Sequence, residues 1–243
     1  MNRRDVLRAT LEAIFTTTRR EADAEGVQVL VTDNNSEDDT PDMLREMEQD
    51  GKLRAWLLPE NLGTSGGRNA HFGECIGHDT VRLDDKALPL VAGWLTTMRA
   101  LSEKHHALLG PPYDPTVRAL EKIAPCVPFF DWPHEQGQGG PVIFIPAQAT
   151  EQLGGIDELP GCRYGWDDCA QVQRAMLLGW HYGFCLNTPW RFTASASPER
   201  RAKAMEYHPL YLERLREYKE AERDVFVPIE STEGYKKGLE ARG

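Results

Sequence analysis

The sequence is poor in the features that mark secreted, membrane-spanning and nucleic-acid-binding chains. Its five cysteines are scattered, odd in number and form no C-x-x-C pair, which argues against a disulfide framework or a zinc site and indicates reduced thiols in a cytoplasmic setting. No apolar run is long enough to span a bilayer, and no signal-peptide pattern opens the chain. Positive charge is also scarce, because the net charge is −10. This excess of acid argues against broad binding to nucleic acid or anionic membranes, although it leaves room for a local basic patch.

The first sixty residues alternate between helical and extended patterns. Apolar residues at helical spacing predict a helix over residues 3–18, and apolar runs at 27–32 and 53–58 predict strands. Between these strands, Thr40 as N-cap and Pro41 at the first helical position predict a second helix. The alternation is typical of a mostly parallel sheet with flanking helices. A chain of 243 residues fits one such α/β domain or two small ones.

The rest of the chain continues the pattern less regularly. Apolar runs predict further strands, and helical spacing predicts helices near 91–101, after Asp168 and over 205–223. The predicted strands begin at Thr80, Ala107, Val142 and Tyr182. The tail after Pro228 is predicted to be weakly ordered.

Two adjacent carboxylates, Asp84 and Asp85, follow the strand that begins at Thr80. Open α/β sheets bind ligands beyond the carboxyl ends of their strands. Carboxylate oxygens there can hold a divalent cation that bridges a substrate's phosphates. An isolated pair of this kind is more often a solvated turn, but its neighbours along the chain reverse that preference.

Two further segments carry possible chemistry. Residues 60–69 form a glycine-rich stretch before a helix, where backbone amides can approach a phosphate, although the spacing matches neither G-x-G-x-x-G nor a Walker loop. Taken alone, this stretch reads as an ordinary loop. Asp167 and Asp168 follow Tyr-Gly-Trp at a predicted helix start. Helix capping explains one of these acids and leaves the second for another role.

Four motifs stand in one order along the chain. They are Asp-Asn-Asn-Ser-x-Asp-x-Thr after a strand, Asn-Leu-Gly…Gly-Gly-Arg-Asn, Leu-Asp-Asp, and Gly-Gly-Ile-Asp-Glu…Tyr-Gly-Trp-Asp-Asp. Each is weak alone, but together they resemble the inverting family 2 glycosyltransferases of the GT-A fold, over about residues 2–186. The resemblance implies a nucleotide-sugar donor and an acceptor hydroxyl.

The resemblance also implies a role for each matching residue. Asp168 matches the general base, and Asp167 would support the site. Asp84 matches the first acid of the D-x-D motif at the metal and diphosphate. The expected nucleotide-sugar site comprises Asp33 at the base, Asn35, Arg68, Asp84, Asp85 and Lys86.

The chain also offers groups for the acceptor and for a metal. Trp132, Trp166 and Trp190 are candidate sugar-stacking surfaces, with core packing equally open for each. The expected metal site consists of Asp84, Asp85 and His208, and would take Mn or Mg.

The chain departs from the family pattern in three places. The family's first strand is missing ahead of Asn2-Arg3, so we expect either a truncated or miscalled start or a rebuilt sheet, with weak stability or self-association. Lys86 replaces the second acid of D-x-D, so we expect it to meet the diphosphate directly and to weaken metal dependence. The family's histidine after the last strand is also absent, and His208 lies further on.

These inferences define one expected organisation. Residues 1–204 form a GT-A-like catalytic domain, with a nucleotide-binding half at about 1–103 and an acceptor half at about 104–204, and residues 205–243 form a helix and tail. The leading hypothesis is a glycosyltransferase that uses UDP- or another NDP-sugar, with an unknown acceptor and possible homo-oligomerisation. The alternative is a catalytically weak nucleotide-sugar-binding protein on the same fold. A nucleotidyltransferase is disfavoured, because no basic glycine-rich activation loop opens the chain.

Overall fold

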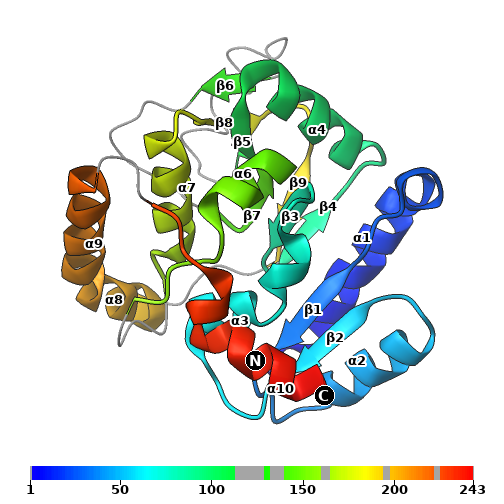
Figure 1. The fold of residues 1–243 in the computed structure, drawn as a ribbon. Coiled ribbons are helices and arrows are strands. Elements are labelled where there is room, and N and C mark those ends of the chain that lie inside the picture. The colour runs from blue at the N-terminus through cyan, green and yellow to red at the C-terminus, as the bar shows by residue number, and fades with distance from the viewer. Residues whose placement is uncertain are drawn as a thin grey trace.

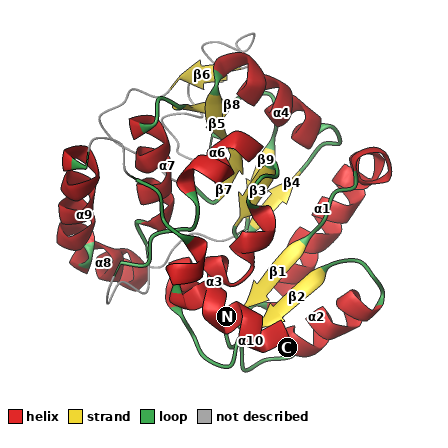
Figure 2. Ribbon diagram, in the orientation of Figure 1, coloured by secondary structure: helices red, strands yellow, loops and turns green. Residues whose placement is uncertain are grey.

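The structure is a computed structural model that describes residues 2–112, 129–131, 140–159, 165–193, 198–221 and 225–242. In these residues helices surround three separate sheets (Figures 1 and 2). The largest is a five-stranded sheet of order β3-β7-β5-β8-β6, and the other two are the pairs β1-β2 and β4-β9. The α/β class predicted from the sequence is confirmed.

The amino-terminal part has the predicted order of helix, strand, helix and strand. The elements are α1 (Arg4–Glu25), β1 (Leu30–Asp33), α2 (Thr40–Gln49) and β2 (Arg54–Leu57). The two strands pair in parallel, and α1 and α2 pack an apolar cluster against them. The cluster centres on Leu11, Met43, Leu44, Met47, Leu53 and Ala55.

The predicted cap of α2 was wrong by one residue. Thr40 is the first helical residue and Asp39 is the N-cap. The physical reason lies one residue earlier, because the carboxylate of Asp38 accepts the backbone N–H of Thr40 at 3.1 Å. That bond satisfies an amide at the helix start, so the side chain of Thr40 is not needed there.

The five-stranded sheet is mixed rather than mostly parallel. It comprises β3 (Thr80–Leu83), β7 (Val142–Ile145), β5 (Ala107–Gly110), β8 (His181–Cys185) and β6 (Phe129–Asp131). Only β5 and β8 run parallel, and β7 lies antiparallel to both β3 and β5. Sequence periodicity could not reveal this, because a strand buried on both faces gives the same apolar run in either direction.

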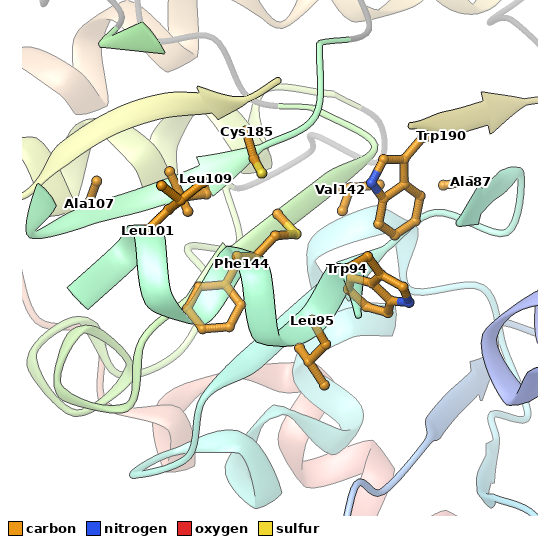
Figure 3. Close-up of a cluster of buried hydrophobic side chains, with 11 residues drawn as sticks. Ala87, Trp94, Leu95, Leu101, Ala107, Leu109, Val142, Phe144, Cys185 and Trp190 are labelled. Carbon is orange, nitrogen blue, oxygen red and sulfur yellow. The ribbon is translucent and has the colours of Figure 1, made fainter. Parts of the chain in front are cut away.

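Alternating side chains of β5 and β7 build a core on each face of the sheet. Leu109 and Phe144 point to one face, toward α4 (Trp94–His105), as Figure 3 shows for part of this cluster. Leu108 and Ile143 point to the other face, toward α6 (Ala147–Leu153) and α7 (Asp167–Leu177). Successive side chains of a strand point to opposite faces, so a central strand contributes residues to both cores.

A short ribbon closes the α4 side of the core. Its strands are β4 (Ala87–Pro89) and β9 (Trp190–Phe192), which pair antiparallel. Trp190 contacts Trp94 edge to face, with ring centroids 5.0 Å apart. This ribbon begins directly after the Asp84–Lys86 turn and therefore helps to fix that turn.

The end of the chain is ordered, contrary to expectation, and it packs on the glycine-rich segment. After η2 (Ile229–Ser231), α10 (Glu233–Arg242) crosses α3 (Gly63–Phe72), which is followed by η1 (Gly73–Cys75). A Cβ on Gly234 would lie 2.1 Å from the carbonyl oxygen of Gly66, and one on Gly238 would lie 2.0 Å from that of Ala70. The segment predicted as a loop is therefore largely helix, with its small residues allowing close helix contact.

Two more helices, α8 (Pro198–Glu206) and α9 (His208–Glu220), replace the single helix expected near 205–223. They lie beside α7 on the side away from β1 and β2 (Figure 1). Tyr211 of α9 is buried against Leu159 and Ala170, so α9 extends the core around the start of α7.

β1 and β3 each leave one edge unpaired across a cavity of about 1310 Å³. In the part of the chain that the structure describes, β1 pairs with β2 alone and β3 with β7 alone. All residues of 26–34 and of 77–85 line the cavity. Successive side chains of a strand point to opposite faces of the sheet. A cavity that every residue of a strand lines must therefore run along the backbone edge of that strand. The cavity thus separates the open edges of β1 and β3.

We predict that joining a six-residue apolar strand ahead of Asn2 raises the melting temperature by about 4 °C or more. The backbone N–H of Asn2 bonds Ser36 at 3.1 Å, and Arg3 pairs with Asp85 at 3.2 Å, so an added strand would enter between the two open edges. Each kcal/mol gained shifts the melting temperature by about 2–4 °C in a chain of this size. Differential scanning calorimetry measures the effect, with a Gly-Ser extension of equal length as control. An equal melting temperature for both extensions would contradict the prediction.

Candidate active site

The carboxyl ends of β1 and β3 meet the amino-terminal turns of α3 and α7 beside the cavity. Asn34, just after β1, spans the start of α3: its amide donates to the carbonyl of Gly63 at 2.7 Å and accepts the N–H of Leu62 at 2.9 Å. Thr64 then donates to Asp167, the first residue of α7, at 3.3 Å. Three segments that are distant in sequence therefore form one polar surface.

Arg68 is the central cation of this surface. From the second turn of α3, its guanidinium donates to Asp84 at 2.9 Å and forms an ion pair with Asp167. Asp167 is only 4% exposed, so its charge depends on this partner. Arg68 thereby joins the acid after β3 to the acid that opens α7.

The remaining residues of the predicted acidic turn are also paired with cations. Lys86 places its ammonium 3.6 Å from the second oxygen of Asp84, and the Lys86 side chain is 18% exposed. Arg3 contacts Asp85 at 3.2 Å, and the hydroxyl of Thr10 donates to the backbone carbonyl of Asp85 at 2.7 Å. The turn is therefore charge-balanced by side chains of the protein itself.

This arrangement does not fit a divalent cation. One oxygen of Asp84 faces Arg68 and the other faces Lys86, and neither cation can ligate a metal. No group of three His, Cys, Asp or Glu side chains that could hold a metal occurs among the described residues. His208 lies instead at the start of α9, stacked on Trp166, so it is not brought together with Asp84 and Asp85.

Asp168 differs from its neighbour Asp167. It is half-buried, and its Oδ1 accepts the N–H of Cys169 at 2.9 Å. No ion pair of Asp168 occurs within the described ranges, whereas Asp167 is neutralised by Arg68. Its place in the first turn of α7 stabilises its negative charge through the helix dipole. Asp168 is thus the carboxylate that remains available at the site.

The turn that presents these acids is held by stacked rings. Trp166 has a φ of 66°, a left-handed conformation that is strained for a bulky residue. Its indole contacts His208, at a centroid distance of 4.4 Å, and Tyr211, at 4.9 Å, and its N–H donates to the carbonyl of Ala204. Burial raises the pKa of Tyr211 well above its usual range, so the phenol stays neutral.

The three tryptophans proposed as sugar-stacking surfaces have different surroundings. Trp166 is half-buried within the ring stack, and Trp190 is 8% exposed in the core cluster of Figure 3. Trp132 lies outside the described residues. Of the two that the structure describes, Trp166 is the one next to the acids.

The predicted nucleotide end lies where β1 stops. Asp33 is 5% exposed, lines the cavity, and accepts the N–H of Ser36 at 2.9 Å. Asn35 takes a φ of 64°, which turns the chain sharply after the strand. Deeper in the cavity wall, burial lowers the pKa of His71 to about 4, so the ring is neutral and pairs with Thr32 at 2.7 Å.

Sequence reasoning missed three residues that organise the site. Asn34 and Thr64 stood inside motifs that had been quoted, and their polar side chains in turn-rich segments were the available signal. Arg3 gave no signal, because its partner Asp85 lies far along the chain.

The chain belongs to a known enzyme family. The profile described as Glycosyl transferase family 2 matches residues 1–131, which include β1, α3 and the Asp84–Lys86 turn. The chain is therefore a family 2 glycosyltransferase. Among curated proteins, none matches the chain in sequence.

Solved structures show the same fold at low sequence identity. The mannosyltransferase PcManGT from Pyrobaculum calidifontis, in complex with GDP-Man and Mn2+, aligns with a TM-score of 0.62 and 15% identity over 99% of this chain and 71% of its own. GalNAc-T7 with UDP, GalNAc and Mn2+ gives 0.60 and 14% over 98% of this chain and 52% of its own. TarS from S. aureus gives 0.53 and 14% over 83% and 36%. These likenesses establish the GT-A fold.

None of the helices within the described ranges is long and apolar enough to cross a bilayer.

We predict that Trp166→Leu lowers the free energy of unfolding by about 2 kcal/mol. The change removes two ring contacts and a hydrogen bond but keeps the strained φ. Urea unfolding followed by circular dichroism measures the loss. Phe226→Leu is the control, because Phe226 is an aromatic side chain that is 51% exposed. Equal losses in the two variants would show that the stack does not support the turn.

Proposed function

We propose that this family 2 glycosyltransferase moves a sugar from a nucleotide-sugar donor to an acceptor hydroxyl with inversion, using Asp168 as general base. The observation that carries this proposal is the difference between two neighbouring acids. Asp167 is tied to Arg68, whereas Asp168 has no ion pair among the described residues and stands in the same helical turn. One acid therefore maintains the site while the other is available to accept a proton.

The donor end of the site is supplied by the strand ends and α3. Asp33 and Asn35 would contact the nucleoside, and Arg68 and Lys86 would meet the diphosphate. The neighbours PcManGT and GalNAc-T7 were solved with GDP-Man and with UDP, which supports an NDP-sugar as the class of donor. Asp33 and Arg68 both line the cavity, so the proposed donor site opens onto it.

The proposed reaction is a single displacement. The acceptor oxygen forms a bond to the anomeric carbon, its proton passes to Asp168, and the bond from that carbon to the diphosphate oxygen breaks. The electron pair leaves with the nucleoside diphosphate. Arg68 and Lys86 stabilise the charge that develops on the leaving group.

A second function, a catalytically weak nucleotide-sugar-binding protein, is favoured by the pairing at Asp84. Both of its oxygens already face cations of the protein, so a donor would have to compete for Arg68 and Lys86. The two functions differ in turnover: an enzyme slowly releases nucleoside diphosphate from a sugar nucleotide, and a binding protein does not.

We predict that Asp168→Asn lowers turnover by about a hundredfold or more while donor affinity stays nearly unchanged. Asparagine keeps the shape and the capping ability of aspartate but removes its basicity. Release of nucleoside diphosphate in the presence of acceptor measures turnover, and isothermal titration calorimetry measures donor binding.

Asp42→Asn is the matched control, because Asp42 is an exposed acid in the first turn of α2. It should retain the turnover of the native protein. Near-native turnover in Asp168→Asn would mean that Asp168 only caps the helix and that another group is the base.

We also predict that the native protein depends little on divalent cations and that Lys86→Asp gains such dependence. At about 4 Å and an effective dielectric near 20, two unit charges interact by about 4 kcal/mol, and a divalent ion roughly doubles this repulsion from Lys86. An aspartate would instead supply the oxygen ligands that Mn or Mg requires. Turnover is measured after chelation and after addition of either metal.

Lys52→Asp, at an exposed lysine paired with Asp50, controls for the change in net charge. Strict metal dependence in the native protein that Lys86→Asp leaves unaltered would refute the role of Lys86.

A further inference from the structure

A buried side-chain link connects the strand of Asp84 to the helix of Asp168. Arg82 of β3 donates from Nη1 to the side-chain oxygen of Gln171 on α7 at 2.6 Å. Arg82 is 7% exposed and Gln171 is 1% exposed. Burying a guanidinium is costly unless its charge is paired and its N–H groups are hydrogen-bonded.

The two ends of this link share faces with the acids of the site. Asp84 follows Arg82 by two residues, just past the end of β3, and its backbone N–H continues the strand pairing by bonding the carbonyl of Pro141 at 2.7 Å, so both side chains project from the same face. Gln171 follows Asp168 by three residues on α7, so both lie on the same side of the helix. The link therefore fixes how far the first turn of α7 stands from the acidic turn after β3.

The link between Arg82 and Gln171 also carries a positive charge, on Arg82. The pKa of Arg82 is lowered to about 10, first by burial and then by the Arg68 guanidinium, while the carboxylates of Asp168 and Asp84 oppose the shift. Arg82 is thus a cation at neutral pH that lies within electrostatic reach of both acids. In the described structure Nη2 of Arg82 and Nε2 of Gln171 have no hydrogen-bond partner. Two buried hydrogen-bond donors beside the site are therefore unpaired.

We propose that Arg82, through Gln171, is a positioning residue for the reaction. Its hydrogen bond holds the first turn of α7, and its charge orients the Asp168 carboxylate toward the donor bound at Arg68 and Lys86. This inference rests on the proposed function, in which Asp168 is the base. It adds a residue that touches neither donor nor acceptor but sets the distance between them.

In the variants that test this role, the order of stability should differ from the order of activity. Replacing a buried polar pair by apolar residues of similar volume is often neutral or stabilising, so Arg82→Met with Gln171→Met should fold at least as well as the native protein. Arg82→Lys keeps the charge but buries a smaller, more strongly hydrated head, so it should be the less stable variant. A purely structural role would give activities in the same order as stabilities.

The experiment compares these two variants with the native protein and with Arg191→Met, a change at an exposed arginine on β9. We expect kcat to fall about thirtyfold or more in the double variant, with the donor KM within about threefold of native. On a logarithmic scale, the fall in kcat of Arg82→Lys should be smaller than that of the double variant by at least a third. This should hold although Arg82→Lys has the lower melting temperature of the two. Arg191→Met should leave kcat unchanged. Native kcat in the double variant, or an activity order that follows stability, would overturn the proposal.

Amide hydrogen exchange tests the link without relying on turnover. The N–H of Ala170 closes the first turn of α7 on the carbonyl of Trp166 at 2.8 Å, and it should exchange at least about tenfold faster in the double variant. Amides of β5 and β7 should be unaffected. Unchanged exchange at Ala170 would refute the link, whereas faster exchange in a protein that turns over no sugar nucleotide would refute the proposed function instead.

Discussion

The site depends on one guanidinium that serves two acids. Arg68 contacts Asp84 after β3 and Asp167 at the start of α7, and it is itself carried by α3. Asp167 is almost fully buried, so removing Arg68 would leave an unpaired charge in the interior, which is among the most destabilising changes a protein can suffer. The same contact brings the strand end of one half of the fold to the helix start of the other. Stability and function therefore rest on the same pair of bonds.

The sequence predicted those parts of the molecule that depend on local pattern. The strands at Thr80 and Val142 and the helix that begins at Asp167 have an apolar run or a cap within a few residues, and the structure contains them. The order of β3, β7 and β5 and their antiparallel pairing arise from long-range packing, which leaves no mark in a buried apolar run. The acids of the site were found because they follow strands and open helices, whereas Arg3 was missed because its partner is remote in sequence.

Two kinds of positive charge could serve a diphosphate at this position, and the protein provides one of them. In the proposed reaction, the ammonium of Lys86 and the guanidinium of Arg68, already held beside Asp84, would stabilise the charge that develops on the leaving group. A metal would have to displace them from Asp84 first. The ring stack around Trp166 complements this arrangement, because it holds a strained turn whose relaxation would move both acids of α7.

The contact between α3 and α10 has a consequence for the order of events during synthesis. Gly234 and Gly238 lie directly against the backbone of the helix that carries Arg68, and Arg242 reaches the carbonyl of Ala55 at 2.9 Å. Chains emerge from the ribosome amino-terminus first, and early segments usually fold before later ones arrive. Here the early segment cannot complete its packing until residues 233–242 have been made. A nascent chain would therefore expose one face of α3 until residues 233–242 have been made.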